Sequence, residues 1–324
     1  MAIPRKYLVD SESVGFYHCI SRCVRRAYLC GDDPVSGRNC DHRKVWLEKR
    51  MLELADIFCV SLYAYAIMDN HYHLVLKVAP KGAEKLTDEQ VAECWLKAYP
   101  GRLDKPENLK LRELKKQAIM TDRTKLAKYR KRLGKLSWFM ARLNEPLAKQ
   151  SNLEDCVNGR FWESRYQSIP LLDETSVLAC MAYVDLNPIR AGITQELEAS
   201  LHTSIKKRID KLRTSTIQMN EPLVPMNKSI DESLYSFNLN DYLALVEWTG
   251  RSIVHPNKAV VPLHISSIFR RLNLQQDNWL NQIQRLCHGK PTMMGSIDKL
   301  RNKAKAIKKR WVKGIGQARL LYQS

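Results

Sequence analysis

The protein has 324 residues, of which 44% are hydrophobic, so the chain can bury one large core or two smaller ones. Its 53 Lys and Arg residues exceed its 34 Asp and Glu residues and give a formal net charge of +19. A surplus of this size attracts polyanions and favours nucleic acid as the partner. The sequence lacks a membrane-length apolar stretch and a signal-peptide-like apolar run, so we expect a cytoplasmic protein without a membrane partner.

The first predicted strand covers residues 15–24, where side chains alternate between two faces. His18 and Arg22 share one of these faces, and we expect them to approach the functional site or a phosphate group of DNA. After a polar loop, Asp41 can cap a helix that runs to about Phe58.

A β-hairpin is predicted next. Residues 59–68 are rich in β-branched and aromatic side chains, residues 69–70 ("DN") supply turn chemistry, and residues 71–78 form the second strand. His71 and His73 follow the turn and, two residues apart, project from the same face. They can bind one metal ion together, or they can be two packing or hydrogen-bonding residues at the head of a strand.

The stretch from about 81 to 150 reads as a basic helical insertion. Thr87 and Gln90 have the spacing of a capping box, and the helical pattern resumes at residue 109. Cations crowd residues 110–132, including Lys128 and Arg132, with aromatic residues interleaved. This pattern is typical of a solvated helix face, but it also suits a surface that holds a phosphate backbone and stacks unpaired bases.

Residues 159–172 predict an irregular segment that leads into a short strand. Arg and aromatic side chains together can bind phosphates and stack on bases, and this segment offers four of them as DNA contacts. For Trp162, core packing is the competing explanation. The four are Arg160, Trp162, Arg165 and Tyr166.

A helix is predicted from Asp173 or Thr175 to about Asn187, because the proline after Asn187 disfavours its continuation. Tyr183 and Asn187 lie four residues apart and therefore on one helix face. A Tyr hydroxyl can be a covalent nucleophile, and an amide oxygen suits magnesium or manganese. The alternative is a core aromatic residue and a helix-ending residue.

The C-terminal third follows a breaker region at 220–233 and is predicted to be all helical. No acidic residue follows position 298, and the basic tail suits either a DNA clamp or a frayed terminus. We expect its DNA contacts at Lys308, Lys309 and Arg310. We predict two domains, at 1–195 and 196–324.

Taken together, these motifs define a reaction. Two imidazoles and an amide can hold a divalent ion that polarises a phosphodiester, and Tyr183 can attack the phosphorus. The covalent phosphotyrosine conserves the energy of the broken bond, which permits strand transfer without ATP.

The segments "NHYHLVL", "GRFWESRYQS" and "AYVDLNPIRAG", with the opening "GFYHCISRCVRRAYLCGDD", resemble the single-tyrosine transposases of the HUH type, in particular the REP-associated tyrosine transposases. The resemblance covers residues 15 to 80 and about 135 to 195. It implies an α+β fold with a ferredoxin-like antiparallel palm and packed helices. It also implies that His71, His73 and Asn187 bind magnesium or manganese and that Tyr183 is the nucleophile.

The resemblance further implies a substrate and a product. The substrate is single-stranded or hairpin DNA from palindromic repeats, the product is a 5′-phosphotyrosine, and the enzyme works as a monomer. The main rival is a non-catalytic binder or regulator of structured single-stranded DNA or RNA. A metal-dependent hydrolase of small phosphoesters also fits the two histidines but leaves the basic charge unexplained.

Overall fold

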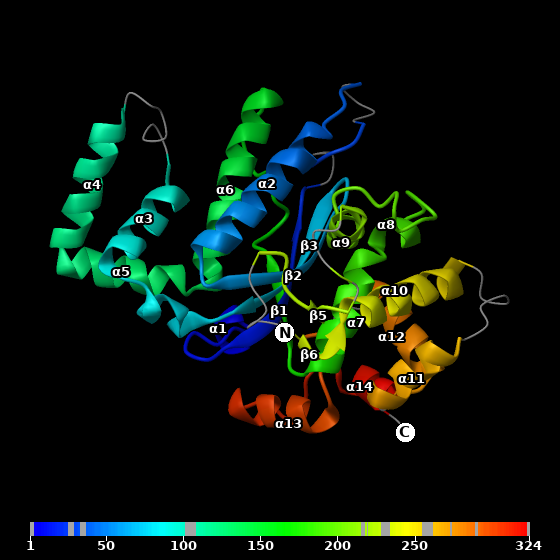
Figure 1. The fold of residues 1–324 in the computed structure, drawn as a ribbon. Helices are drawn as coiled ribbons and strands as arrows, with labels where there is room; N and C mark the ends of the chain where they lie inside the picture. Colours follow the sequence, from blue (N-terminus) through cyan, green and yellow to red (C-terminus); the bar gives the residue numbers. More distant parts are fainter. Residues whose placement is uncertain are drawn as a thin grey trace.

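The computed structural model describes residues 3–24, 29–32, 37–100, 108–214, 218, 220–227, 234–254, 262–272, 274–288 and 291–322. Its centre is a four-stranded antiparallel sheet with the strand order β2-β3-β1-β4, surrounded by helices (Figure 1). The expected α+β class with an antiparallel sheet is therefore confirmed. The four strands are β1 (Gly15–Arg22), β2 (Val60–Ile67), β3 (His71–Val78) and β4 (Gln167–Leu171).

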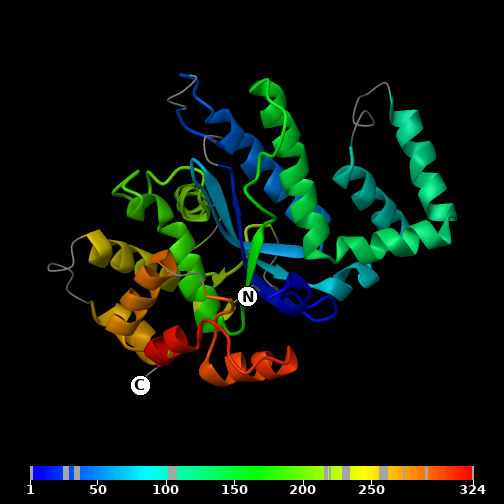
Figure 2. The same ribbon diagram turned by 180° about the vertical axis from the view of Figure 1, so that it is seen from behind.

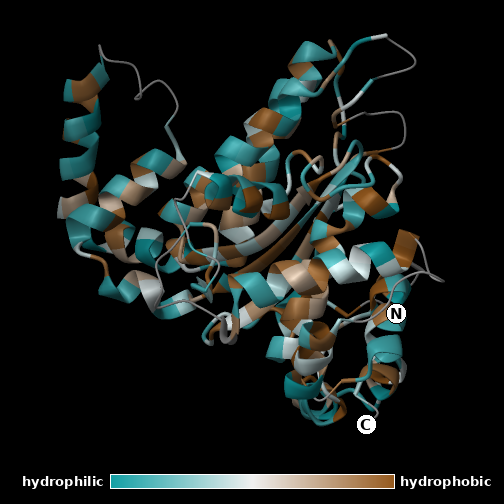
Figure 3. Ribbon diagram, turned by 45° about the vertical axis from the view of Figure 1, so that its right-hand side comes forward, coloured by the Kyte–Doolittle hydropathy of each residue, from teal (hydrophilic) through white to brown (hydrophobic). Residues whose placement is uncertain are grey.

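The sheet is covered on both faces. Helices α2 (His42–Ile57) and α6 (Leu136–Glu154) lie side by side on one face, and α7 (Glu174–Asp185) crosses the other (Figure 1). Because side chains alternate along a strand, β1 contributes Tyr17 and Cys19 to the first core and Ile20 to the second. Figure 3 shows the strands as mainly hydrophobic ribbons between helices with hydrophilic outer faces.

The predicted first strand, first helix and hairpin are present at nearly the expected bounds, but the role expected for Asp41 is wrong. Asp41 makes no side-chain cap on α2. Its carboxylate instead accepts a hydrogen bond from the Gly31 backbone N–H at 3.0 Å and contacts the Lys44 ammonium at 2.9 Å. The side chain therefore ties the preceding loop to the helix.

The basic insertion forms an arm that stands away from the sheet (Figures 1 and 2). The expected capping box at Thr87 and Gln90 is present and begins the first helix. A 3₁₀ turn, η1, leads into the arm, and a short α1 precedes β1. The bounds of these elements are α1 (Arg5–Leu8), η1 (Pro80–Lys85) and, for the three helices of the arm, α3 (Asp88–Ala98), α4 (Leu109–Thr121) and α5 (Arg123–Leu133).

The N-terminus of the tyrosine-bearing helix α7 is held by side chains. Asp173 caps the N-terminus in a capping box with Ser176, as one of the two expected caps. The same carboxylate accepts hydrogen bonds from the Ser296 N–H and the Tyr322 hydroxyl, each at 2.6 Å, so the tail fixes this end. The helix ends at Asp185, close to the expected end, but the expected effect of Pro188 on Asn187 is wrong. After Leu186, Asn187 begins a short helix α8 (Asn187–Arg190), and Pro188 lies in its first turn, where a proline is tolerated.

The C-terminal third is not entirely helical, which corrects the expectation. β5 and β6 form a two-stranded antiparallel ribbon, in which β6 follows the predicted breaker region. The other elements of this part are helices that pack around α7 and its neighbours (Figure 1). In order they are α9 (Ser204–Arg213), β5 (Pro222–Leu223), β6 (Leu234–Asn238), α10 (Leu239–Val254), α11 (Leu263–Leu272), α12 (Gln276–His288), α13 (Ile297–Ala306) and α14 (Ile315–Leu321).

One hydrophobic core joins the sheet to these C-terminal helices. It contains Ile20 and Val75 from the sheet, Val177 from α7, and Leu245 and Trp279 from α10 and α12. The predicted division of the chain at residue 195 stays a prediction. Within the parts of the chain that the structure describes, no helix is both long enough and apolar enough to span a membrane.

Candidate active site

The two histidines of the hairpin lie at the start of β3 on the face that α7 covers. His71 is paired with Arg22 of β1, and His73 is paired with Ile20. Their ring centroids are 4.8 Å apart, with the planes at 78°. His73 is 2% exposed, whereas His71 lies at the sheet end and is half-buried.

Each histidine has a side-chain partner at Nδ1. His71 Nδ1 lies 2.6 Å from Asn70 Oδ1, and because an amide oxygen only accepts, this imidazole nitrogen donates. His73 Nδ1 lies 2.8 Å from Nε2 of His18, so these two rings share one proton. A donating Nδ1–H places the lone pair of an imidazole on Nε2, which is the form that a metal-binding histidine takes.

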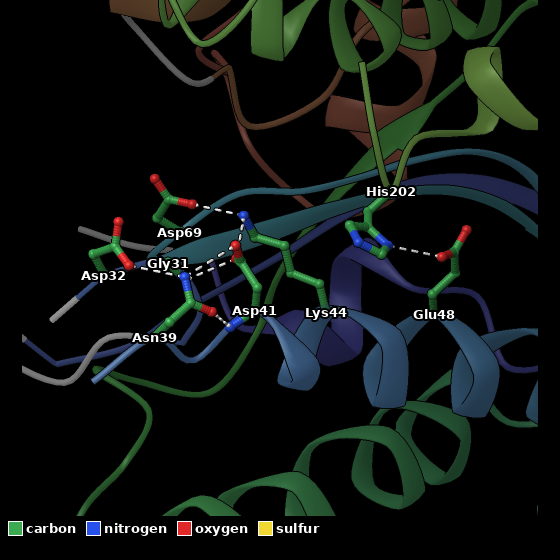
Figure 4. Close-up of polar contacts among 8 residues, drawn as sticks. All are labelled: Gly31, Asp32, Asn39, Asp41, Lys44, Glu48, Asp69 and His202. Carbon is green, nitrogen blue, oxygen red and sulfur yellow. Dashed lines mark hydrogen bonds and ion pairs between the residues drawn. The ribbon is translucent and has the colours of Figure 1, made fainter. Parts of the chain in front are cut away.

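The hairpin turn that precedes His71 is anchored by charge. Lys44 of α2 contacts both Asp41 and Asp69 at 2.9 Å (Figure 4). Burial by itself lowers the pKa of Lys44, but the hydrogen bonds with the two carboxylates outweigh it and raise the pKa. The Asp69 carbonyl also accepts from the Cys30 N–H at 2.9 Å. The turn is therefore tied to α2 and to the loop before it.

Tyr183 meets the histidines from α7. Its ring centroid is 5.6 Å from that of His73 and 6.0 Å from that of His18, in edge-to-face contacts. The tyrosine is 6% exposed. The guanidinium of Arg190 lies over the same ring, 4.9 Å from its centroid. Two motifs that are far apart in the sequence thus come together across the sheet face.

Asn187 begins α8, directly after the tyrosine helix. Its Nδ2 donates to the backbone carbonyl of Tyr183 at 3.1 Å and reaches that of Val184 at 3.4 Å. With the amide nitrogen used in this way, Oδ1 is the atom of Asn187 that suits a metal ion. Asn187 is therefore hydrogen-bonded through its amide nitrogen to the last turn of the tyrosine helix.

By donor type alone, the three predicted ligands suit a magnesium or manganese ion only with help from the substrate, and their binding of a metal stays a prediction. Among the described residues, no group of three or more His, Cys, Asp or Glu side chains could hold a metal ion. Two imidazoles and one amide make three protein ligands, and ions at phosphoryl-transfer sites commonly complete their shell with phosphate oxygens and water. His71, His73 and Asn187 are compatible with that arrangement.

The predicted contacts on the segment before β4 flank a hollow against α6. Arg160 and Arg165 are exposed, Trp162 is half-buried, and Tyr166 is buried. Trp162 forms a bridge with Cys23, and the Glu163 N–H donates to the Arg22 carbonyl at 2.9 Å. The segment therefore runs beside the end of β1, next to the strand end that carries His71.

The predicted contacts on the arm and tail lie apart from the histidines. Lys128 of α5 is exposed, but Arg132 lies over the Trp138 ring at 4.0 Å, and Tyr129 stacks on Trp95 at 4.0 Å. These aromatic faces therefore hold the arm together. The tail contacts Lys308, Lys309 and Arg310 are all exposed after α13, followed by a tryptophan that is 64% exposed.

Sequence reasoning missed two residues at the site. Arg190 is the last residue of α8, beyond the predicted end of the tyrosine helix, so no local pattern indicated its contact with Tyr183. Asp185 is completely buried, and burial raises the pKa of its carboxyl group. A lone acid in the otherwise apolar run from 177 to 186 was the signal for a buried polar network.

The chain was compared with known proteins. No family model matches it, and no curated protein matches it. A solved structure of the REP-associated tyrosine transposase bound to a REP hairpin is similar over 74% of this chain and 97% of that chain, with a TM-score of 0.38 and 11% sequence identity. A likeness of this size carries no argument about function.

Proposed function

We propose that the protein is a metal-dependent DNA endonuclease and strand transferase, a transposase of the HUH single-tyrosine type. The observation that carries the proposal is the contact of Tyr183 with His73 across the sheet, at 5.6 Å between ring centroids. In this proposal the sheet is a ferredoxin-like palm. The order β4-β1-β3-β2, with helices after β1 and after β3, is the β-α-β-β-α-β arrangement that supports this assignment.

In the proposed reaction, Tyr183 Oη attacks the phosphorus of a phosphodiester in an unpaired strand. The Oη–P bond forms and the P–O3′ bond breaks, the phenol loses its proton, and the leaving 3′-oxygen gains one. The products are a 5′-phosphotyrosine and a free 3′-hydroxyl. The same step in reverse, with a 3′-hydroxyl of another strand end, gives strand transfer.

The side chains around Tyr183 divide the remaining work. A magnesium or manganese ion held by His71, His73 and Asn187 would polarise the phosphodiester. Asn70 and His18 orient the two imidazoles through their Nδ1 atoms. Arg190, whose guanidinium lies over the Tyr183 ring, can stabilise negative charge that develops at the phosphate.

Single-stranded or hairpin DNA from palindromic repeats is the proposed substrate. The net charge of +19 supports a polyanionic substrate, and exposed cations occur on the arm, before β4 and after α13. A non-catalytic binder of structured DNA or RNA is the second candidate. The burial of Tyr183, which is 6% exposed, favours that alternative because a nucleophile must reach its substrate.

A covalent-adduct assay tests the proposal. Hairpin oligonucleotides from palindromic sequences near the gene, labelled at either end, are mixed with the protein in manganese or in EDTA. We expect a denaturant-stable adduct that needs manganese, keeps the label on the 5′-phosphate side, and disappears in Tyr183→Phe and His71→Ala.

Two matched controls separate chemistry from general damage. Tyr7→Phe and His264→Ala change an exposed tyrosine and an exposed histidine outside the site, and both are expected to form the adduct normally. Tight hairpin binding without any adduct in the wild type would reject the enzyme and support the binder.

A further inference from the structure

One feature that the proposed chemistry does not use is a cavity of about 580 Å³ between α6 and the segment before β4. Its lining includes Met140, Ala141 and Asn144 from α6. Trp162 and Tyr166 from the segment and Arg5 from α1 complete this part of the wall. A cavity of this volume is in the range that holds small organic ligands.

The aromatic walls of the cavity are held in place before any ligand arrives. The Trp162 indole N–H donates to the Asn144 carbonyl at 3.0 Å, and its ring meets that of Tyr72 edge-on with centroids 5.8 Å apart. The Arg5 guanidinium lies over the Tyr166 ring, 3.6 Å from its centroid. Arg5 thereby covers one face of the buried Tyr166 ring, so the half-buried Trp162 is the aromatic surface of the lining that is offered to a flat ligand. A pre-formed aromatic surface binds a flat ligand without a large ordering cost.

The charges around the cavity indicate what kind of flat ligand it takes. The lining carries three arginines, of which Arg160 and Arg165 are exposed to solvent, and two exposed glutamates, Glu145 and Glu163, so cations are in excess. Stacking surfaces next to arginines are the combination that binds an unpaired nucleobase together with its phosphates. A ligand with an anionic backbone also matches the net charge of +19.

The cavity lies close to the proposed active site. Arg22 is paired with His71 on one side, and its carbonyl accepts from the Glu163 N–H on the other. Because neighbouring strands lie about 4.8 Å apart, the path from His71 across β1 to this segment is roughly 10 Å. The cavity lies on the α6 face of the sheet and Tyr183 lies on the α7 face, so a single strand reaches the cavity from the scissile phosphate by passing around the end of β1.

We propose that this cavity binds one unpaired nucleobase of the DNA strand that is cleaved, with the flanking phosphates on Arg160 and Arg165. The inference rests on the proposed function, because it assigns a substrate contact to the same strand. By holding a base at a fixed distance from Tyr183, the cavity selects which phosphodiester is placed at the nucleophile.

Anisotropy measurements with the full chain test this assignment. The probe is a fluorescein-labelled DNA hairpin with short unpaired flanks, in which abasic sites replace the flanking bases one at a time. We expect one position at which the abasic site weakens binding by about 5- to 150-fold, the equivalent of about 1 to 3 kcal/mol of base stacking. Trp162→Ala should weaken binding of the intact probe and remove the effect of that abasic site.

A second variant is needed because Trp162 also packs against Tyr72. Ala141→Leu fills the cavity from an exposed position of α6 and leaves the aromatic walls intact. Ala118→Leu, at an exposed position of α4, is the matched control. We expect the cavity-filling variant to bind the intact probe as weakly as the abasic one, and the control to behave as the wild type.

The outcomes separate this inference from the proposed function. If wild type forms the Tyr183 adduct but no abasic site weakens binding, or if Ala141→Leu keeps the full abasic effect, the cavity assignment is wrong and the enzyme assignment stands. If the abasic effect is present and is lost in Ala141→Leu, but no adduct forms, the cavity assignment stands and the enzyme assignment fails. Absence of binding to every probe overturns both.

Discussion

His18 and His73, on the adjacent strands β1 and β3, share a hydrogen bond of 2.8 Å between Nε2 and Nδ1. His18 is 2% exposed and also meets the ring of Tyr183. A buried imidazole held in this way orients its neighbour and not a distant phosphate. His18 therefore acts in our proposal as the residue that fixes the ring and tautomer of His73.

Replacing His18 is expected to weaken metal binding. Partners that orient a metal-binding histidine typically change metal affinity by about 10- to 100-fold when they are removed. We expect a loss of this size for Mn²⁺ in His18→Ala, measured by calorimetry or by the EPR signal of the unbound ion. His18→Gln, whose amide can still hydrogen-bond His73, should recover part of the affinity.

The control for this measurement is His264→Ala, an exposed histidine on α11. It should bind Mn²⁺ as the wild type does. Equal Mn²⁺ affinity in wild type and His18→Ala would show that the contact between the two imidazoles does not support a metal site.

The Glu48 carboxylate is expected to make stability depend on acid pH. Burial alone would raise its pKa, but hydrogen bonds with His202 and Tyr65 and the charge of Lys207 lower the pKa to about 2 (Figure 4 shows the His202 contact). A depressed native pKa stabilises the fold above the unfolded value near 4.5, and this contribution is lost as pH falls towards 2.

Glu48→Gln should therefore lower the free energy of unfolding at pH 7 by about 1 to 3 kcal/mol. The difference from wild type should shrink between pH 4.5 and 2. Urea denaturation at several pH values checks this expectation, with Glu53→Gln, a more exposed acid on the same helix, as the control. A difference that stays constant down to pH 2 would contradict it.

How much of the site the sequence predicts depends on the range of the interaction. Local rules placed the hairpin, the capping box of α3 and the N-terminal cap of α7, because turn residues and caps act within a few positions. They placed the end of α7 to within two residues, although Pro188 lies inside α8 and not at the break. The contact between the histidine pair and Tyr183 was expected because both motifs occur in the same chain. The spacing of these residues along the sequence does not by itself predict it.

The same local rules do not predict contacts between distant segments. Asp41 has the sequence position of a helix cap, but its carboxylate instead accepts a hydrogen bond from the Gly31 N–H and forms an ion pair with Lys44. Arg132 was expected to face DNA and lies over Trp138. In both cases a partner supplied by the folded structure competes with the local assignment, and sequence spacing does not reveal that partner.

The buried Asp185 network is expected to connect the tyrosine helix to the C-terminal helices. Its carboxylate accepts hydrogen bonds from the Ser204 hydroxyl, the Ile205 N–H and the Tyr242 hydroxyl. Tyr242→Phe removes one donor without changing the ring, and we expect a loss of about 1.5 to 3 kcal/mol in the free energy of unfolding, the range for a hydrogen bond to a charged group.

Chemical denaturation measures this loss, and Tyr7→Phe at an exposed position should change stability by less than about 0.5 kcal/mol. Equal stability of Tyr242→Phe and wild type would mean that the network does not contribute to holding α7 against α10.

The basic tail after α13 is expected to contribute to DNA affinity mainly through phosphate contacts. Each phosphate that a cation neutralises on a single strand adds about 0.7 to the slope of log affinity against log salt. Replacing Lys308, Lys309 and Arg310 by serine should reduce the magnitude of that slope by about 2 if all three contact phosphates. Binding of the hairpin probe over a series of salt concentrations measures it. Serine at Lys49, Lys81 and Lys85, three exposed lysines outside the tail, is the charge-matched control. A loss of slope that is equal in the two triple variants would mean that the tail acts only through net charge and not as a contact surface.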